Sequence, residues 1–175
     1  MDLNDFDKTI DHWIISSEGY SLQQLLFKHS DTEWSLGQLF SHLIESTSFF
    51  LQQINDCLSN YENQNEELSL SAREIFKNNQ LPGIEIEGPE SNNFTAQPEN
   101  VASVKSGLLN LKNEFSRIKK ILLLNKISGK RKHPGLGYFN AAEWFQFAEI
   151  HLRHHFIQKT KLESWLKILA NQNRQ

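Results

Sequence analysis

The chain is poor in cysteine, with Cys57 as the single one among 175 residues. One cysteine cannot form a disulfide within the chain, and it excludes the cysteine-rich type of zinc site. This usage is typical of the reducing cytoplasm, where we expect the protein to work. Cys57 has no histidine near it in the sequence, so we do not interpret it as a nucleophile.

The sequence also lacks a long apolar run and an excess of positive charge. No segment approaches the roughly 20 apolar residues that cross a bilayer, and the acidic N-terminus lacks the order of a signal peptide. Eighteen basic residues against 21 acidic ones give a net charge of -3. Nucleic acid and anionic membranes both require a concentrated positive surface, so we expect neither as a partner. The one basic cluster, residues 126–132, is interpreted as a solvated loop.

Proline is scarce, and three of the four prolines fall between Gln80 and Asn100. With Gly83 and Gly88 they predict a long irregular connection, which is either a solvated crossover or a lid. Elsewhere apolar residues recur three and four positions apart, which predicts helices. The predicted long helices cover residues 5–28, 35–60, 99–126 and 141–170, with one or two helical turns at 71–77.

Capping residues support two of these helix starts. Ser35 begins the second helix, and Asn140 with Glu143 forms a capping box before the fourth. No internal repeat and no β-hairpin is predicted. Four long helices with a long crossover between the second and third predict an all-α four-helix bundle, in a single domain over residues 1–175.

Three histidines form the candidate site. His151 and His155 are four residues apart, so on a helix they project from the same face. His42 lies among apolar residues of the second predicted helix and is expected to point inward. Three imidazoles and one open position are the pattern of a catalytic metal. Neutral imidazole suits Zn, Ni, Fe or Cu, and the sequence does not choose among them.

The spacing by itself also fits histidines on the surface, or core histidines that bond to backbone and water. Gln158 and Glu45 lie within reach, by helical spacing, of the ring nitrogens that a metal would leave unused. Glu45 is equally a candidate for a fourth ligand or a general base, and His154 for a proton carrier or an exposed residue. The remaining histidines are interpreted as structural (His12, His29 and His133).

Two motifs together resemble a known family. One is the block from His133-Pro134 through Glu143-Trp144 to His151-x-x-His154-His155-x-x-Gln158, and the other is the segment from Trp34 to Leu43 that contains His42. The chain resembles the DinB-like (YfiT-like) superfamily of metal-dependent proteins, in a branch without an assigned activity. The resemblance covers nearly the whole chain.

The resemblance implies a four-helix bundle, a homodimer, and a divalent metal on His42, His151 and His155 with water completing the shell. Some relatives use the metal to activate a low-molecular-weight thiol. We therefore expect a metal-dependent enzyme that transfers such a thiol to a small electrophile, with Glu45 or His154 moving the proton. The alternatives are a metal-dependent hydrolase and a non-catalytic helical dimer that binds metal or a small ligand.

Overall fold

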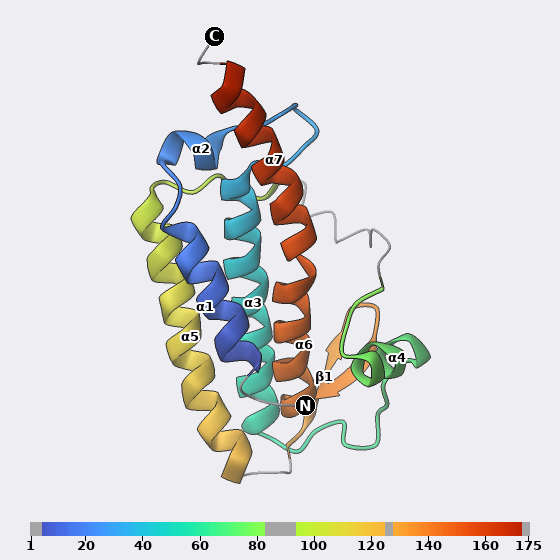
Figure 1. Ribbon diagram of the computed structural model, residues 1–175. Helices are drawn as coiled ribbons and strands as arrows, with labels where there is room; N and C mark the ends of the chain where they lie inside the picture. Colours follow the sequence, from blue (N-terminus) through green and yellow to red (C-terminus); the bar gives the residue numbers. More distant parts are fainter. Residues whose placement is uncertain (1–4, 83–93, 125–127, 173–175) are drawn as a thin grey trace.

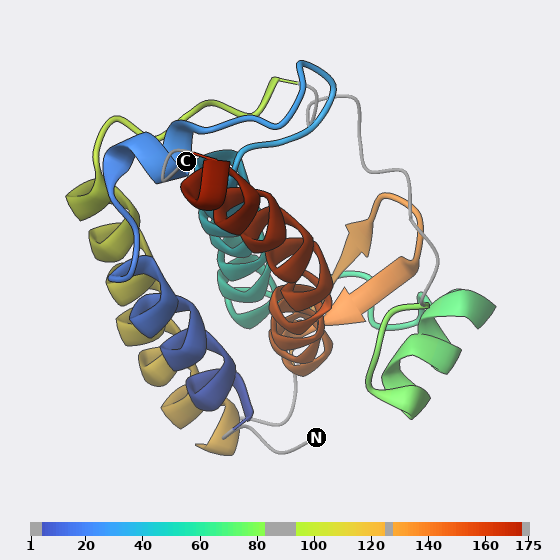
Figure 2. The ribbon, with the colours of Figure 1, turned by 45° about the horizontal axis from the view of Figure 1, so that its top comes forward.

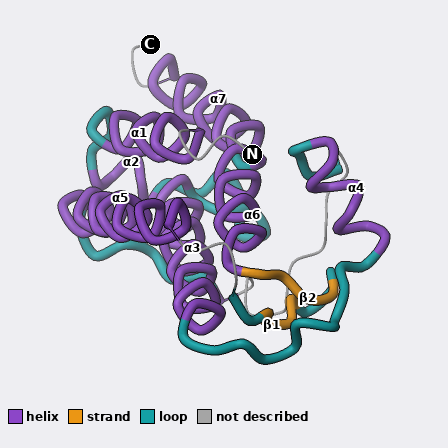
Figure 3. Tube along the Cα trace, turned by 90° about the horizontal axis from the view of Figure 1, so that it is seen from below, coloured by secondary structure: helices purple, strands orange, loops and turns teal. Residues whose placement is uncertain are grey.

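The computed structural model describes residues 5–82, 94–124 and 128–172. Most of these residues are helical, which confirms the all-α class. The long helices are α1 (Asp5–Ser17), α3 (Leu36–Leu58), α5 (Val101–Leu124) and α6 (Ala141–His154), the last continued by α7 (Phe156–Gln172). They lie side by side in Figure 1. Helix α3 packs on α5 and α6, and α1 packs on the same two helices, as the view along the helices in Figure 3 shows.

Two predicted helices are each divided in the structure. The first ends at Ser17, and the short α2 (Leu22–Leu26) follows. Gly19 lies in the gap, and Ser21 with Gln24 forms a capping box that starts a new helix. The fourth predicted helix is divided at His155, between α6 and α7. No proline or glycine occurs in residues 141–172, so local composition did not predict this second division.

Both predicted caps are confirmed. Ser35 caps α3 through a reciprocal pair of bonds with Gln38. Asn140 and Glu143 form the expected capping box at the start of α6. The short helix expected at 71–77 is α4 (Leu70–Asn78). These caps matter for the site because α3 and α6 carry its histidines.

A β-hairpin lies where the sequence predicted only a loop, and this prediction was wrong. Strand β1 (Lys130–His133) pairs with β2 (Gly137–Asn140) in antiparallel register, with His133 opposite Gly137. The segment around Leu68 holds the hairpin, because Ser69 N–H donates to Leu136 O and Tyr138 N–H donates to Glu67 O. Local propensity cannot predict bonds between residues so far apart in the sequence. Figure 2 shows the hairpin and α4 beside the long helices, not among them.

Gly137 is the residue that this arrangement requires. Its φ of +85° lies in the region that favours glycine, and a Cβ there would lie 2.6 Å from Glu67 O. Gly135, in the same turn, has open space around it. The hairpin therefore depends on one glycine of the two.

Large aromatic side chains fill the space between the long helices. Trp13, Phe40, Phe115 and Trp144 are fully buried. Trp13 N–H donates to Leu152 O, so its one polar atom is satisfied.

No helix within the described ranges is long and apolar enough to cross a membrane. Residues 83–93 of the connection from Gln80 to Asn100 lie outside the described residues. The choice between a solvated crossover and a lid therefore stays a prediction.

Candidate metal centre

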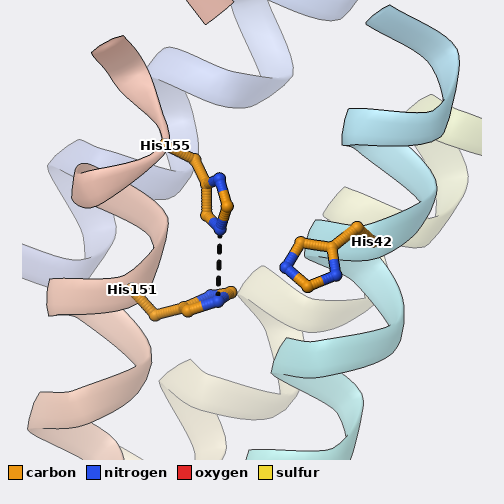
Figure 4. Close-up of side chains that lie close together, drawn as sticks. All are labelled: His42, His151 and His155. Carbon is orange, nitrogen blue, oxygen red and sulfur yellow. Dashed lines mark hydrogen bonds between the residues drawn. The ribbon is translucent and has the colours of Figure 1, made fainter. Parts of the chain in front are cut away.

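His42, His151 and His155 come together in space (Figure 4). We call them the histidine triad. His42 projects from α3 near its start, His151 from the last turns of α6, and His155 from the junction of α6 and α7. Helices α3 and α6 run in opposite directions, since Phe50 meets Phe147 while His42 meets His155. The first turns of one helix thereby lie beside the last turns of the other.

The ring nitrogens of the triad converge. One ligand atom from each of the three rings lies within 4.8 Å of the other two. His155 Nε2 and His151 Nε2 are 3.2 Å apart. Two imidazole nitrogens on one tetrahedral zinc ion lie about 3.3 Å apart, from metal–nitrogen bonds of about 2.0–2.1 Å. The spacing of this pair therefore suits one shared cation.

Gln158 orients one of the rings. His155 Nδ1 lies 2.8 Å from Gln158 Oε1, which accepts its proton. The Nε2 lone pair of His155 is then left facing the other two rings. The sequence predicted this role for Gln158. A bond of this kind fixes the tautomer and the orientation of a metal-binding imidazole.

Burial keeps the triad uncharged near neutral pH. Desolvation lowers the pKa of His42 to about 4. It also lowers the pKa of His155 to about 3, assisted by the neighbouring His42. The pKa of His151 falls well below its usual value, first by desolvation and then by repulsion from the surrounding histidines. Neutral imidazole is the form that binds metal, so these rings do not have to lose a proton first.

One polar atom of the triad remains unsatisfied. His151 Nδ1 is buried and has no hydrogen-bond partner among the described residues. With Gln158 holding the proton of His155 on Nδ1, the 3.2 Å contact places the proton of His151 on Nε2. A cation bound between the three rings would occupy the lone pair of His151 Nε2, and the proton of His151 would then reside on its Nδ1. The triad thus fits a divalent cation through three nitrogens, with one ring lacking an outer partner.

Aromatic side chains surround the triad. Trp34 lies against His42 at an interplanar angle of 54°, with ring centroids 5.1 Å apart. Phe50 meets His151 edge-on at 5.3 Å. Phe147, one turn before His151 on α6, lies 6.4 Å from it. An apolar wall of this kind lowers the local dielectric and strengthens electrostatic effects at the site.

The two predicted proton carriers occupy different surroundings. His154 lies beside the triad, with its ring centroid 5.4 Å from that of His155, and desolvation lowers its pKa. Glu45 is exposed on α3, three residues after His42. Within the described part of the chain, its carboxylate makes no hydrogen bond or ion pair. Of the two, His154 is the residue that the fold brings next to a triad ring.

His133, which the sequence led us to interpret as structural, also lies in this region. It is half-buried at the end of β1, with its ring 5.0 Å from that of Phe147 and 5.5 Å from that of Trp144. It is also close enough to affect the pKa of His151. Its position depends on a hairpin that local sequence did not predict, and the signal that pointed to it is its place at the start of the family motif. By contrast, His12 and His29 are exposed; His12 meets Phe156 edge-on, and His29 stacks on Trp165.

The protein belongs to the DinB superfamily. The sequence profile of that family matches residues 6–158. This span contains the whole triad and ends at Gln158, the partner of His155. A comparison with curated proteins finds no match.

Proposed function

We propose that this DinB-superfamily protein is a divalent-metal-dependent enzyme, with the metal on His42, His151 and His155. The convergence of three neutral imidazoles within 4.8 Å is the observation that carries the proposal. Three protein nitrogens leave at least one position for water or substrate, which is the pattern of catalytic and not structural sites. On this proposal the long helices form the four-helix bundle expected of the family.

We propose thiol transfer as the reaction. A bound divalent cation supplies Lewis-acid chemistry, which lowers the pKa of a thiol and favours the thiolate near neutral pH. The sulfur electron pair then forms a bond to the electrophilic carbon as the leaving group departs. The thiol proton needs an acceptor, and His154 suits this role because its lowered pKa keeps it neutral at pH 7.

The surroundings of the triad suit such a reaction. Trp34, Phe50 and Phe147 present apolar surface to the imidazoles. A small electrophile with an apolar body gains binding energy on such a wall, and water is kept from the thiolate. Glu45 is the second candidate for proton transfer, at the exposed side of α3. A homodimer and a cytoplasmic location stay predictions.

The first test is metal content. Protein purified without a histidine tag is analysed by plasma mass spectrometry, beside a His42→Ala, His151→Ala, His155→Ala variant. We expect about one transition metal per chain, lost in this variant while the helical circular dichroism persists. A His12→Ala, His29→Ala variant is the matched control, since both residues are exposed, and it should keep the metal.

The second test is activity of the loaded protein. A low-molecular-weight thiol is mixed with an alkyl halide, and release of halide is followed. We expect release that depends on the metal and is lost in the triad variant. If neither protein takes up metal after soaking with Zn and Ni, the metalloenzyme proposal is wrong. Metal uptake without halide release, for any thiol tried, would contradict the thiol-transfer part alone.

A further inference from the structure

A series of ring contacts connects the β-hairpin to the triad. His133 lies against Trp144 with an interplanar angle of 30° and centroids 5.5 Å apart. Trp144 lies against Phe50 at the same angle and 5.7 Å. Phe50 in turn contacts His151 of the triad edge-on. The ring of His133 is thereby fixed at the far end of an aromatic wall whose near end is a proposed metal ligand.

The tautomer of His133 is set by the turn that follows it. Gly135 N–H donates to His133 Nδ1 at 3.2 Å, so Nδ1 is the acceptor and the proton resides on Nε2. No acceptor for this Nε2–H is found among the described residues. The hairpin register opposite Gly137 and the contacts with Phe139 and Phe147 hold the ring in place. His133 is therefore a fixed donor that bonds to none of the described residues, and its Nε2 is not among their buried unpaired atoms, so an acceptor from solvent can reach it.

Trp144 provides a second donor, and this one is buried. Its side chain is fully buried (0 % exposed), yet its Nε1–H has no hydrogen-bond partner in the described structure. A buried donor without an acceptor costs about 1–3 kcal/mol, and tryptophan N–H groups in protein interiors usually have one. Trp13, equally buried, donates to Leu152 O. An unsatisfied donor that the ring of Phe50 links to His151 therefore needs an explanation.

We propose that His133 Nε2–H and Trp144 Nε1–H form a subsite for an acceptor oxygen, the carbonyl or carboxylate oxygen of a small, largely apolar substrate. The aromatic rings around the two donors provide the apolar surface for the rest of the molecule. Phe49 contacts Trp144 edge-on and is 43 % exposed, whereas Phe50, Phe139 and Phe147 are buried, so this ring is the one that can move to admit a ligand.

The inference rests on the proposed function, because it identifies the electrophile of the same site. The electrophile would be anchored by its oxygen at the hairpin end and would present its reactive carbon toward the triad. His133 and Trp144 are positioning residues in this scheme, and neither exchanges a proton with the substrate.

The test is a titration of the metal-free and the metal-loaded protein, monitored through ¹⁵N–¹H spectra of the four tryptophan indoles. The probes are phenylacetate, phenylacetamide and toluene, which share an aromatic body and differ in the oxygen. The Trp144 signal is assigned by its loss in Trp144→Phe. We expect phenylacetate or phenylacetamide to shift this signal downfield, while the signal of Trp13, already bonded, stays in place.

His133→Phe keeps the ring and removes the donor. We expect it to weaken binding of the oxygen-bearing probes about three- to tenfold, the value of one neutral hydrogen bond, and to leave toluene unaffected. His29→Phe is the matched control, because His29 also stacks on a tryptophan, Trp165, away from the triad. Binding of both oxygen probes, or of phenylacetate alone, supports the subsite. If both bind, the subsite accepts a carbonyl as well as a carboxylate oxygen, and if only phenylacetate binds, it requires a carboxylate.

Two results would overturn the subsite. One is a Trp144 signal that does not move with any probe, and the other is toluene binding as tightly as the oxygen-bearing probes. The metal-free titration separates this inference from the proposed function. A protein that fails to load metal can still bind phenylacetate through the two donors, and a loaded protein can fail to bind it.

Discussion

Replacing Gln158 by leucine should weaken metal binding without unfolding the protein. Gln158 Oε1 accepts the Nδ1 proton of His155 at 2.8 Å, and no other described residue bonds to that nitrogen. Leucine leaves the half-buried Nδ1–H without its acceptor and frees the ring to rotate or change tautomer. Loss of such an outer partner costs 10- to 100-fold in metal affinity in other sites, or about 1.4–2.7 kcal/mol.

The assay is competition for Zn²⁺ with a chromophoric chelator at pH 7.5, which gives Kd over several decades. Gln158→Glu is the second variant, because a carboxylate also accepts from Nδ1 and makes the imidazole more basic. We expect Gln158→Leu to raise Kd by about 10- to 100-fold and Gln158→Glu to leave it equal or lower.

Gln146→Leu is the matched control for this change. Gln146 is a half-buried glutamine on α6 that donates to Asn79 Oδ1 and not to a histidine. Its loss should reduce stability slightly and leave Kd within about threefold. If Gln158→Leu binds Zn²⁺ as tightly as the unchanged protein, or if Gln146→Leu weakens binding equally, then Gln158 does not orient a metal ligand.

Two further predictions concern the folded state. Unfolded histidines titrate near pH 6.5, whereas burial lowers the pKa of His133 to about 4 and lowers those of the triad as well. The unfolded chain therefore binds more protons between these values, so the metal-free protein should lose stability as pH falls from 7 to 5. Urea unfolding at both pH values should show that the free energy of unfolding is lower at pH 5 than at pH 7, and His133→Phe should reduce this difference by about 1 kcal/mol. A free energy of unfolding that does not change with pH would contradict the burial argument. Gly137→Ala should lower the free energy of unfolding by about 1–3 kcal/mol, because Gly137 has a positive φ and Glu67 O lies close to it. Gly135→Ala should change the same quantity by no more than about 0.5 kcal/mol, because this residue has open space around it. Equal effects of the two substitutions would show that the hairpin does not depend on the conformation of Gly137.

The sequence was most informative where chemistry is repeated at helical spacing. Apolar residues three and four apart located α3 and α5 to within a few residues. His151 and His155 could be paired because four residues bring side chains to one face of a helix. Helix α6 ends at His154, yet His155 keeps helical dihedral angles (φ -75°, ψ -3°), so the predicted pairing survives the division of the helix. Ser35 and Asn140 marked helix starts through bonds that involve neighbours only.

The sequence was least informative where a feature depends on distant partners. The hairpin of residues 130–140 has strands of four residues, and its closure depends on Glu67 and Ser69, more than 60 positions earlier. His133 acquires its surroundings through that closure, so its proximity to Trp144 could not be predicted from local pattern. The break at His155 was also not predicted, because no proline or glycine marks it.

Packing alone does not explain histidines at the three triad positions. Apolar side chains of similar size would fill the same space between α3 and α6 without the cost of desolvating polar rings. The histidines lower stability further below pH 6.5, and His151 Nδ1 lacks a partner even when the rings are neutral. The three rings nevertheless direct nitrogens toward one another, and Gln158 fixes one of them in the tautomer that leaves its inner nitrogen free. An arrangement that is unfavourable for the empty core and favourable for a cation is what a binding site requires, because local rules of stable packing are broken mainly where function demands it.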